Sequence, residues 1–95
     1  MRVTHGPFNV DCLTTKEPPA ILQALTLRIL PDINSTYRMI GEFKLLCEWQ
    51  SLKFSIEVTH YEYTEFLYVL RFDRIGGDAS EFNKLYRSIL TSLNL

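Results

Sequence analysis

The residues of this chain that most often do chemistry in proteins are its two histidines and two cysteines. His60 follows Val58 in the alternating phase of a predicted strand, so we interpret it as a satisfied or edge histidine rather than as a general base. Cys12 and Cys47 have no second cysteine or histidine at the spacing of a zinc site. These residues therefore predict neither catalysis nor a metal centre.

A paired glycine before a predicted helix is the next candidate, because such a turn can cradle a phosphate. The sequence Gly76-Gly77-Asp78 lacks the glycine spacing and the lysine of a P-loop. Asp78 also puts a negative charge where an anion would otherwise bind. It is a good N-cap, and Glu81 completes a capping-box-like pair. We interpret the turn as structural, and we expect no catalytic residue, no metal and no cofactor.

The composition describes an ordinary small globular domain. The chain has 95 residues, of which 46% are hydrophobic and 22% charged, so residues 1–95 are expected to form a single domain with 1–7 as a lead-in. The formal net charge of -1 gives no global attraction to nucleic acid or to an anionic membrane. With no signal peptide and no apolar run long enough to span a bilayer, we expect a cytoplasmic location and two buried free thiols.

The first third of the chain is predicted to contain one strand and one helix. Phe8–Leu13 alternates apolar and polar residues, which is the period of a half-buried strand. Thr14–Pro19 contains a helix-start signal, since proline is favoured in the first turn of a helix. Pro31 is expected to end this helix, because its ring clashes with the preceding turn.

The middle of the chain is predicted to be an antiparallel meander of four strands. In the third of these, apolar residues alternate with Lys53, Ser55, Glu57 and Thr59, which predicts one buried and one solvated face. The four strands are expected at Tyr37–Ile40, Phe43–Trp49, Leu52–Tyr61 and Phe66–Arg74.

The last element is predicted to be an amphipathic helix that starts at the Asp78 cap. Its apolar residues recur at three- and four-residue steps, so one stripe can lie on a sheet. The order is therefore β-α-β-β-β-β-α. This order predicts an α+β two-layer sandwich, an antiparallel sheet of four to five strands with two helices on one face.

Aromatic residues interleaved with a basic one raise the alternative of single-stranded nucleic-acid binding. The strand V-L-R-F-D-R does not match the RNA-binding pattern, which needs a basic residue and a glycine before several aromatics. We therefore expect no nucleic-acid partner and assign the aromatics to the core and the sheet surface. They are Tyr61, Tyr63, Phe66, Tyr68 and Phe72, with Arg71 among them.

The order of these segments resembles the kinase-associated 1 (KA1) domain of AMP-activated-kinase-related Ser/Thr kinases. L-K-F-S-I-E-V at Leu52–Val58 is similar to one strand of that family, and T-T-K-E-P-P-A-I-L at Thr14–Leu22 is similar to its helix start. The resemblance runs from about residue 6 to the end. The closing motif of the family is matched by Leu70, Phe72, Arg74, Ile75, Gly77 and Asp78, followed by F-N-K-L-Y-R-S-I-L-T-S-L-N-L.

A second resemblance lies within the same superfamily. I-G-E-F-K-L-L-C-E-W at Ile40–Trp49 is similar to a strand in the C-terminal domain of the α-subunit of AMP-activated and Snf1-type kinases. That domain scaffolds partner subunits, but it usually carries long insertions after the meander, which this chain lacks. The KA1 resemblance is therefore preferred, and the scaffold is the alternative.

The KA1 resemblance implies a non-catalytic regulatory domain of an ATP-binding Ser/Thr protein kinase. Such domains hold their own kinase domain in check, bind phosphatidylserine and phosphoinositides at the inner face of the plasma membrane, or do both. In this chain Asp73 stands where relatives often have lysine, so acidic residues are mixed with basic ones. The candidate residues for lipid or partner binding are Arg28, Lys53, Arg71, Arg74, Lys84 and Arg87.

Overall fold

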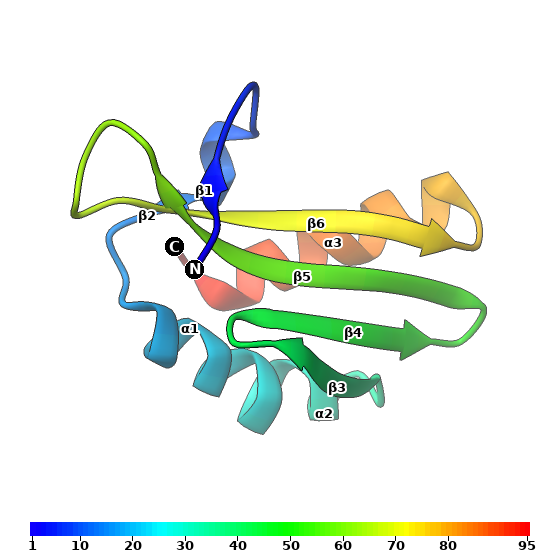
Figure 1. Ribbon diagram of the computed structural model, residues 1–95. Coiled ribbons are helices and arrows are strands. Elements are labelled where there is room, and N and C mark those ends of the chain that lie inside the picture. The colour runs from blue at the N-terminus through cyan, green and yellow to red at the C-terminus, as the bar shows by residue number, and fades with distance from the viewer.

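The computed structural model describes residues 1–95 and contains one six-stranded, mostly antiparallel sheet. Its main path has the order β2-β6-β5-β4-β3, and the short β1 pairs in parallel with the end of β5 (Figure 1). The strands are β1 Val3–Thr4, β2 Leu13–Thr14, β3 Thr36–Gly41, β4 Lys44–Trp49, β5 Leu52–Tyr61 and β6 Tyr68–Gly76.

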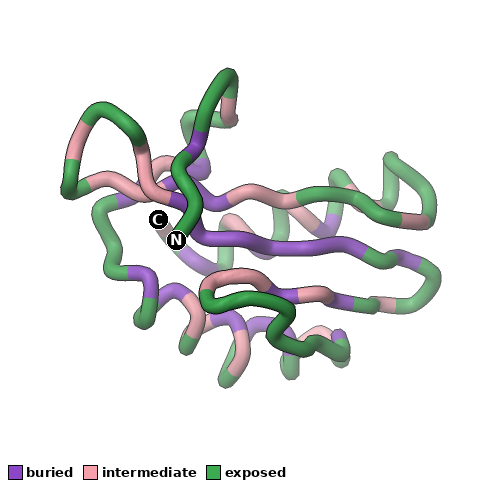
Figure 2. Tube along the Cα trace, viewed as in Figure 1, coloured by how far each residue is buried: buried purple, intermediate pink, exposed green.

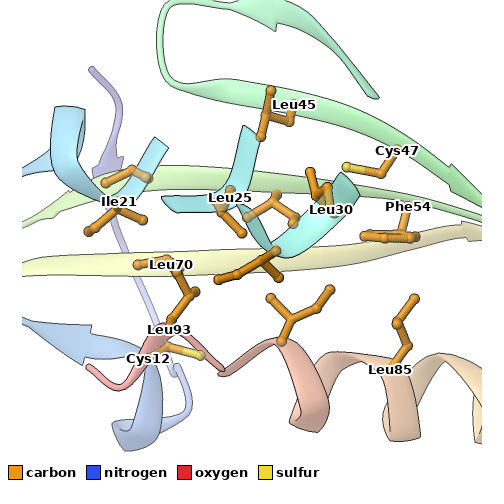
Figure 3. Packing of buried hydrophobic residues seen from close by; sticks show 14 of the residues in the cluster. Cys12, Ile21, Leu25, Leu30, Leu45, Cys47, Phe54, Leu70, Leu85 and Leu93 are labelled. Atoms are coloured by element: carbon orange, nitrogen blue, oxygen red, sulfur yellow. The ribbon is translucent and has the colours of Figure 1, made fainter. Parts of the chain in front are cut away.

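The helices form the second layer, as the sequence predicted. The first helical segment comprises α1 (Pro18–Ala24), a π-helical turn (Leu25–Ile29) and α2 (Leu30–Asp32), and the last is α3 (Ala79–Leu93). Apolar residues from both segments join one buried cluster with the strands (Figure 3). The two-layer α+β class is therefore confirmed.

Pro31 lies within the helical segment rather than at its end. The turn before it is widened, with the Leu30 N–H donating to the Leu25 carbonyl five residues back. A proline ring clashes with the carbonyl four residues earlier and donates no hydrogen bond, and a π-type turn is one way a helix accommodates this. The helix therefore continues through Pro31 and ends at Asp32, so the prediction that Pro31 ends it is wrong.

The meander was predicted closely. The bounds of β5 are those expected, while β6 begins two residues later than predicted, at Tyr68. β5 is the central strand and is buried along most of its length (Figure 2). Phe54, Ile56 and Val58 on its inner face are at most 1% exposed.

The predicted strand Phe8–Leu13 is wrong over most of its length. Residues Val10–Cys12 form a 3-10 turn, and only Leu13–Thr14 is extended. The Asn9 side chain accepts a hydrogen bond from the Asp11 N–H at 2.9 Å. This local bond competes with a strand ladder, which explains the difference. The segment predicted as a lead-in, in turn, contributes β1.

The turn into α3 is built as the sequence predicted. The Asp78 side chain accepts the Glu81 N–H at 2.9 Å and caps the helix. The other half of the predicted capping box is absent, since the Glu81 carboxylate lies 4.0 Å from the Lys84 ammonium instead. Gly77 has φ +101, a backbone conformation that residues with a side chain rarely adopt.

Both cysteines are buried free thiols, as expected. Burial raises the pKa of Cys47 to about 12, and it also raises the pKa of Cys12, whose sulfur lies 3.1 Å from the Tyr86 hydroxyl. Both thiols are therefore protonated at neutral pH and pack as small apolar side chains.

Candidate functional site

The face of the sheet that the helices leave open carries a compact group of charged side chains. Lys44 and Arg71 are the cross-strand partners of Glu57, on β4 and β6 respectively. Directly paired residues of antiparallel strands share a face of the sheet. Arg2 approaches Glu57 from the N-terminal segment. We refer to Arg2, Lys44, Glu57 and Arg71 as the Glu57 cluster.

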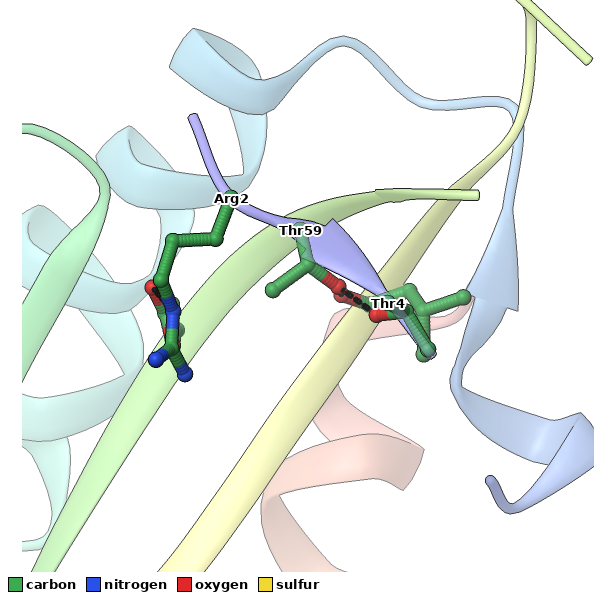
Figure 4. Close-up of polar contacts among 5 residues, drawn as sticks. Arg2, Thr4 and Thr59 are labelled. Atoms are coloured by element: carbon green, nitrogen blue, oxygen red, sulfur yellow. Dashed lines mark hydrogen bonds and ion pairs between the residues drawn. The ribbon is translucent and has the colours of Figure 1, made fainter. Parts of the chain in front are cut away.

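Arg2 binds Glu57 in the bidentate geometry that suits a guanidinium and a carboxylate. Its Nε donates to Glu57 Oε2 at 2.9 Å and its Nη2 donates to Glu57 Oε1 at 2.7 Å (Figure 4). The Glu57 side chain is only 8% exposed, whereas that of Arg2 is 71% exposed. The hydrogen bond and the charge of Glu57 raise the pKa of Arg2.

The burial of Glu57 corrects the prediction that this face of β5 is solvated. Ser55 and Thr59, which share the face, are also buried. β5 is flanked by a strand on each side, and the N-terminal segment adds cover that the sequence pattern does not reveal. A buried carboxylate is stable only when it is paired, and Arg2 supplies the pair.

Two polar hollows open on either side of Arg2. The first has a volume of about 420 Å³ and is lined by Arg2, Val3, Thr4, His5, Thr59 and Arg71. The second, of about 380 Å³, is lined by residues 1–2, 41–44 and Glu57. Thr4 and Thr59 both line the first hollow, and their hydroxyls are hydrogen-bonded to each other (Figure 4).

The chemistry available in this cluster is electrostatic binding. Arg2 pairs with the Glu57 carboxylate, and Lys44 and Arg71 are the register partners of Glu57 on the adjacent strands. Arg2 and Arg71 also line the first hollow. His5 is paired with the Glu62 carboxylate at 3.1 Å. The structure has no group of three or more histidine, cysteine or acidic side chains that could hold a metal ion. The cluster can attract an anionic or mixed-charge partner.

The structure separates the six predicted site residues into different regions. Lys53 and Arg71 lie on the open face, where Lys53 is paired with Glu48 of β4. Arg71 also donates to the Pro7 carbonyl at 3.3 Å. Arg74, near the end of β6, donates to the Gly77 carbonyl at 2.7 Å and so holds the turn before α3.

The other three predicted residues lie in the helical layer. Arg28 donates to the Ser92 carbonyl at 3.3 Å, close to where Lys16 donates to the Leu93 carbonyl at 2.9 Å. Both cations satisfy carbonyls in the last turn of α3, which is also the negative end of the helix dipole. Lys84 and Arg87 lie on α3 and are exposed.

Sequence reasoning anticipated the mixed charges of the open face but missed Arg2. Acidic residues, Asp73 among them, were expected beside Lys53 and Arg71. Arg2 lies 55 residues from Glu57 in the chain, within the segment taken as a lead-in. No local pattern connects the two residues.

Comparison with known proteins gives a family for this arrangement. The model of the family Kinase associated domain 1 (KA1) matches residues 50–95. The predicted resemblance to the KA1 family is confirmed over these residues. The matched residues include all of β5, β6 and α3, and two members of the Glu57 cluster, Glu57 and Arg71, lie among them.

A curated relative covers almost the whole domain. It is described as a probable serine/threonine-protein kinase MARK-A from Dictyostelium discoideum, and it is 24% identical over 94 residues. The match covers 99% of this chain but 9% of the relative. No helix of this chain is long and apolar enough to cross a membrane. The family match and the kinase relative together support a regulatory domain of the kinase-associated type.

Proposed function

We propose that this KA1 domain regulates a Ser/Thr kinase by docking on the kinase domain through the open face of its sheet. The observation that carries the proposal is the Glu57 cluster, a buried carboxylate paired with Arg2 and flanked in the sheet by a lysine and an arginine, on a face that no helix covers. The kinase-associated family and the kinase relative support the choice of partner.

The alternation of charge on this face favours a protein partner. Glu48 and Asp73 lie on it beside Lys53 and Arg71. A protein surface can present the complementary pattern, and opposite charges that meet in register give specificity and faster association. Autoinhibition by such docking needs a reversible contact, which a polar, partly solvated surface provides.

A second function, binding of phosphatidylserine or phosphoinositides, is favoured by one feature of the face. The first hollow is lined by Arg2 and Arg71, and arginine side chains suit a phosphate. Each well-placed cation contributes about 1 kcal/mol of attraction to an anionic leaflet. Asp73 and Glu57 reduce that attraction, so lipid binding at the inner face of the plasma membrane is the weaker proposal. Scaffolding of partner subunits is the third candidate function.

The deciding experiment adds the purified domain in trans to its cognate kinase domain and measures phosphorylation of a substrate peptide. We expect inhibition by the wild type and at least a fivefold weaker inhibition by the double variant Lys53→Glu/Arg71→Glu. The matched control is Lys84→Glu/Arg87→Glu, which makes the same charge change on the helical layer. If both double variants lose inhibition equally, or if the wild type does not inhibit the kinase domain, docking through the open face is excluded.

Sedimentation with phosphatidylserine vesicles at physiological salt separates the lipid function from docking. We expect little wild-type protein in the vesicle pellet. If a large fraction sediments and Lys53→Glu/Arg71→Glu abolishes it, the membrane is the ligand of this face.

A further inference from the structure

The edge of β6 beyond β2 is a second surface, distinct from the open face. β2 pairs only with Val69 and Tyr68, so no strand lies beside the following residues of β6 (Figure 1). An unpaired strand edge presents backbone donors and acceptors to any extended chain. The question is whether this edge is shaped to receive one.

The backbone phase of β6 can be derived from one hydrogen bond. The Tyr61 N–H donates to the Leu67 carbonyl at 3.0 Å, and in an antiparallel ladder such pairs recur at every second residue. The register between the strands is unbroken through Asp73, whose backbone groups therefore face β5. Those of Phe72 and Arg74 face away, toward the free edge.

A groove of about 290 Å³ runs along this edge. Four consecutive residues of β6, 70–73, line it. Side chains of consecutive residues alternate between faces, so all four can border one groove only if it follows the edge of the strand. Its other walls are Phe82, Asn83 and Tyr86 of α3, residues 7–9 of the N-terminal segment, and Cys12.

We propose that the edge of β6 at Leu70–Arg74 binds an extended peptide, which pairs antiparallel as an added strand and places one large apolar side chain in the groove. Addition of a strand at a sheet edge takes affinity from backbone hydrogen bonds and specificity from pockets for alternate side chains. Here the backbone groups of Phe72 supply the bonds, and the aromatic wall of α3 supplies the pocket. This edge adjoins the open face and shares Arg71 with it, but the inference does not rest on the proposed function.

The charges beside Phe72 define the order of residues in the peptide. Arg71 and Asp73 share the open face, so an antiparallel peptide meets Asp73 first. A basic residue opposite Asp73, an apolar residue opposite Phe72 and an acidic residue opposite Arg71 complete the match. Read from its N-terminus, the peptide is basic–apolar–acidic.

A second copy of this chain is a poor occupant of the edge. In antiparallel self-pairing centred on Phe72, Ile75 of the other copy would lie opposite Val69. That position is already occupied by Leu13 of β2. Self-pairing centred on Asp73 would place two Asp73 carboxylates directly opposite each other, which is unfavourable. The edge is therefore open to a foreign peptide and protected against its own copy.

The test titrates the 95-residue domain with the blocked peptide Thr-Lys-Leu-Glu-Thr and follows its backbone amide resonances by NMR. The matched control peptide, Thr-Glu-Leu-Lys-Thr, has the same composition with the charges exchanged. We expect the first peptide to shift the amides of Phe72 and Arg74 and to bind about fivefold more tightly than the second. Asp73→Lys should cancel the preference, because each peptide then meets one opposite and one like charge.

A groove-filling variant separates binding from folding. Asn83 is exposed on α3 and lines the groove, so Asn83→Trp should abolish the shifts while leaving the unfolding midpoint unchanged. Arg87→Trp, one turn along α3, is the control and should bind normally. The proposal is wrong if the shifts fall on the open face, if neither peptide binds at millimolar concentration, or if the two bind equally. It is equally wrong if phosphatidylcholine vesicles move the same amides, or if the free domain dimerises through β6.

Discussion

Alanine substitution at three glycines separates backbone strain from steric overlap in the turn that joins β6 to α3. Gly77 has φ +101, and a Cβ there would lie 2.6 Å from Leu52 Cδ2 and 2.8 Å from the Ser51 carbonyl oxygen. Gly6 has φ +79, but a Cβ there would meet nothing within 4 Å. Gly76 has an ordinary φ, and its Cβ would lie 4.0 Å from the nearest atom, Lys53 Cβ.

These geometries predict an ordered loss of stability. Gly6→Ala should cost about 1 kcal/mol, because a side chain disfavours positive φ. Gly77→Ala should cost about 3 kcal/mol, since overpacking adds about 2 kcal/mol more where the backbone oxygen of Ser51 cannot move aside. Gly76→Ala should change the free energy of unfolding by less than about 0.5 kcal/mol.

Urea denaturation followed by circular dichroism measures all three, and thermal melts provide a second scale. For a domain of this size each kcal/mol corresponds to about 4–8 °C in Tm, so Gly77→Ala should melt more than about 12 °C below the wild type. If Gly77→Ala is no less stable than Gly6→Ala, the close approach of the β4–β5 turn to Gly77 is not a constraint. The structural interpretation of the Gly76-Gly77-Asp78 turn would then fail.

Three further predictions address the cap, the core and a buried thiol. Asp78→Ala should lower the free energy of unfolding by about 1 kcal/mol, and Asp78→Ser should restore most of it, as urea titrations can show. Ile89→Ala should lower the free energy of unfolding by about 2–5 kcal/mol in the same assay, because the Ile89 side chain is 1% exposed and its removal leaves a cavity in the core. Burial raises the pKa of Cys47 from 9.0 to about 12, so the unfolded chain releases this proton first and stability should fall from about pH 9 to pH 12. Cys47→Ala should reduce that slope by up to about 1.4 kcal/mol per pH unit, and an unchanged slope would contradict the burial argument.

The sequence was sufficient to predict the elements whose structure depends on residues close together in the chain. The alternation in Leu52–Tyr61 predicted β5 with its observed bounds, and the Asp78 cap predicted the start of α3. The same reasoning failed between residues 8 and 13, where the side chain of Asn9 binds the backbone locally. Strand alternation and a local side-chain bond compete there, and the periodicity alone does not show which is stronger.

The charged site was predictable only in part, because it combines local and distant partners. The alternating phase of β5 and β6 is enough to place Lys53 and Arg71 on one face, and the strand register agrees. The burial of Glu57 requires Arg2, and that pair joins residues 55 positions apart in the chain. The contact of Arg28 with the Ser92 carbonyl likewise depends on how the two helical segments pack.

The open face and the β6 groove meet at Arg71. This residue flanks Glu57 on the open face, lines the groove and donates to the Pro7 carbonyl of the N-terminal segment. The same segment carries Arg2, which pairs with Glu57. A peptide that draws the Arg71 guanidinium toward its acidic residue withdraws a cation from the open face, since one side chain cannot fully satisfy both. By thermodynamic linkage, a partner bound through Arg71 on the open face must lower the affinity of the groove for the peptide by the same factor by which the peptide lowers the affinity for that partner. The two proposed surfaces are therefore expected to compete, and Arg71→Ala should make their occupancies independent.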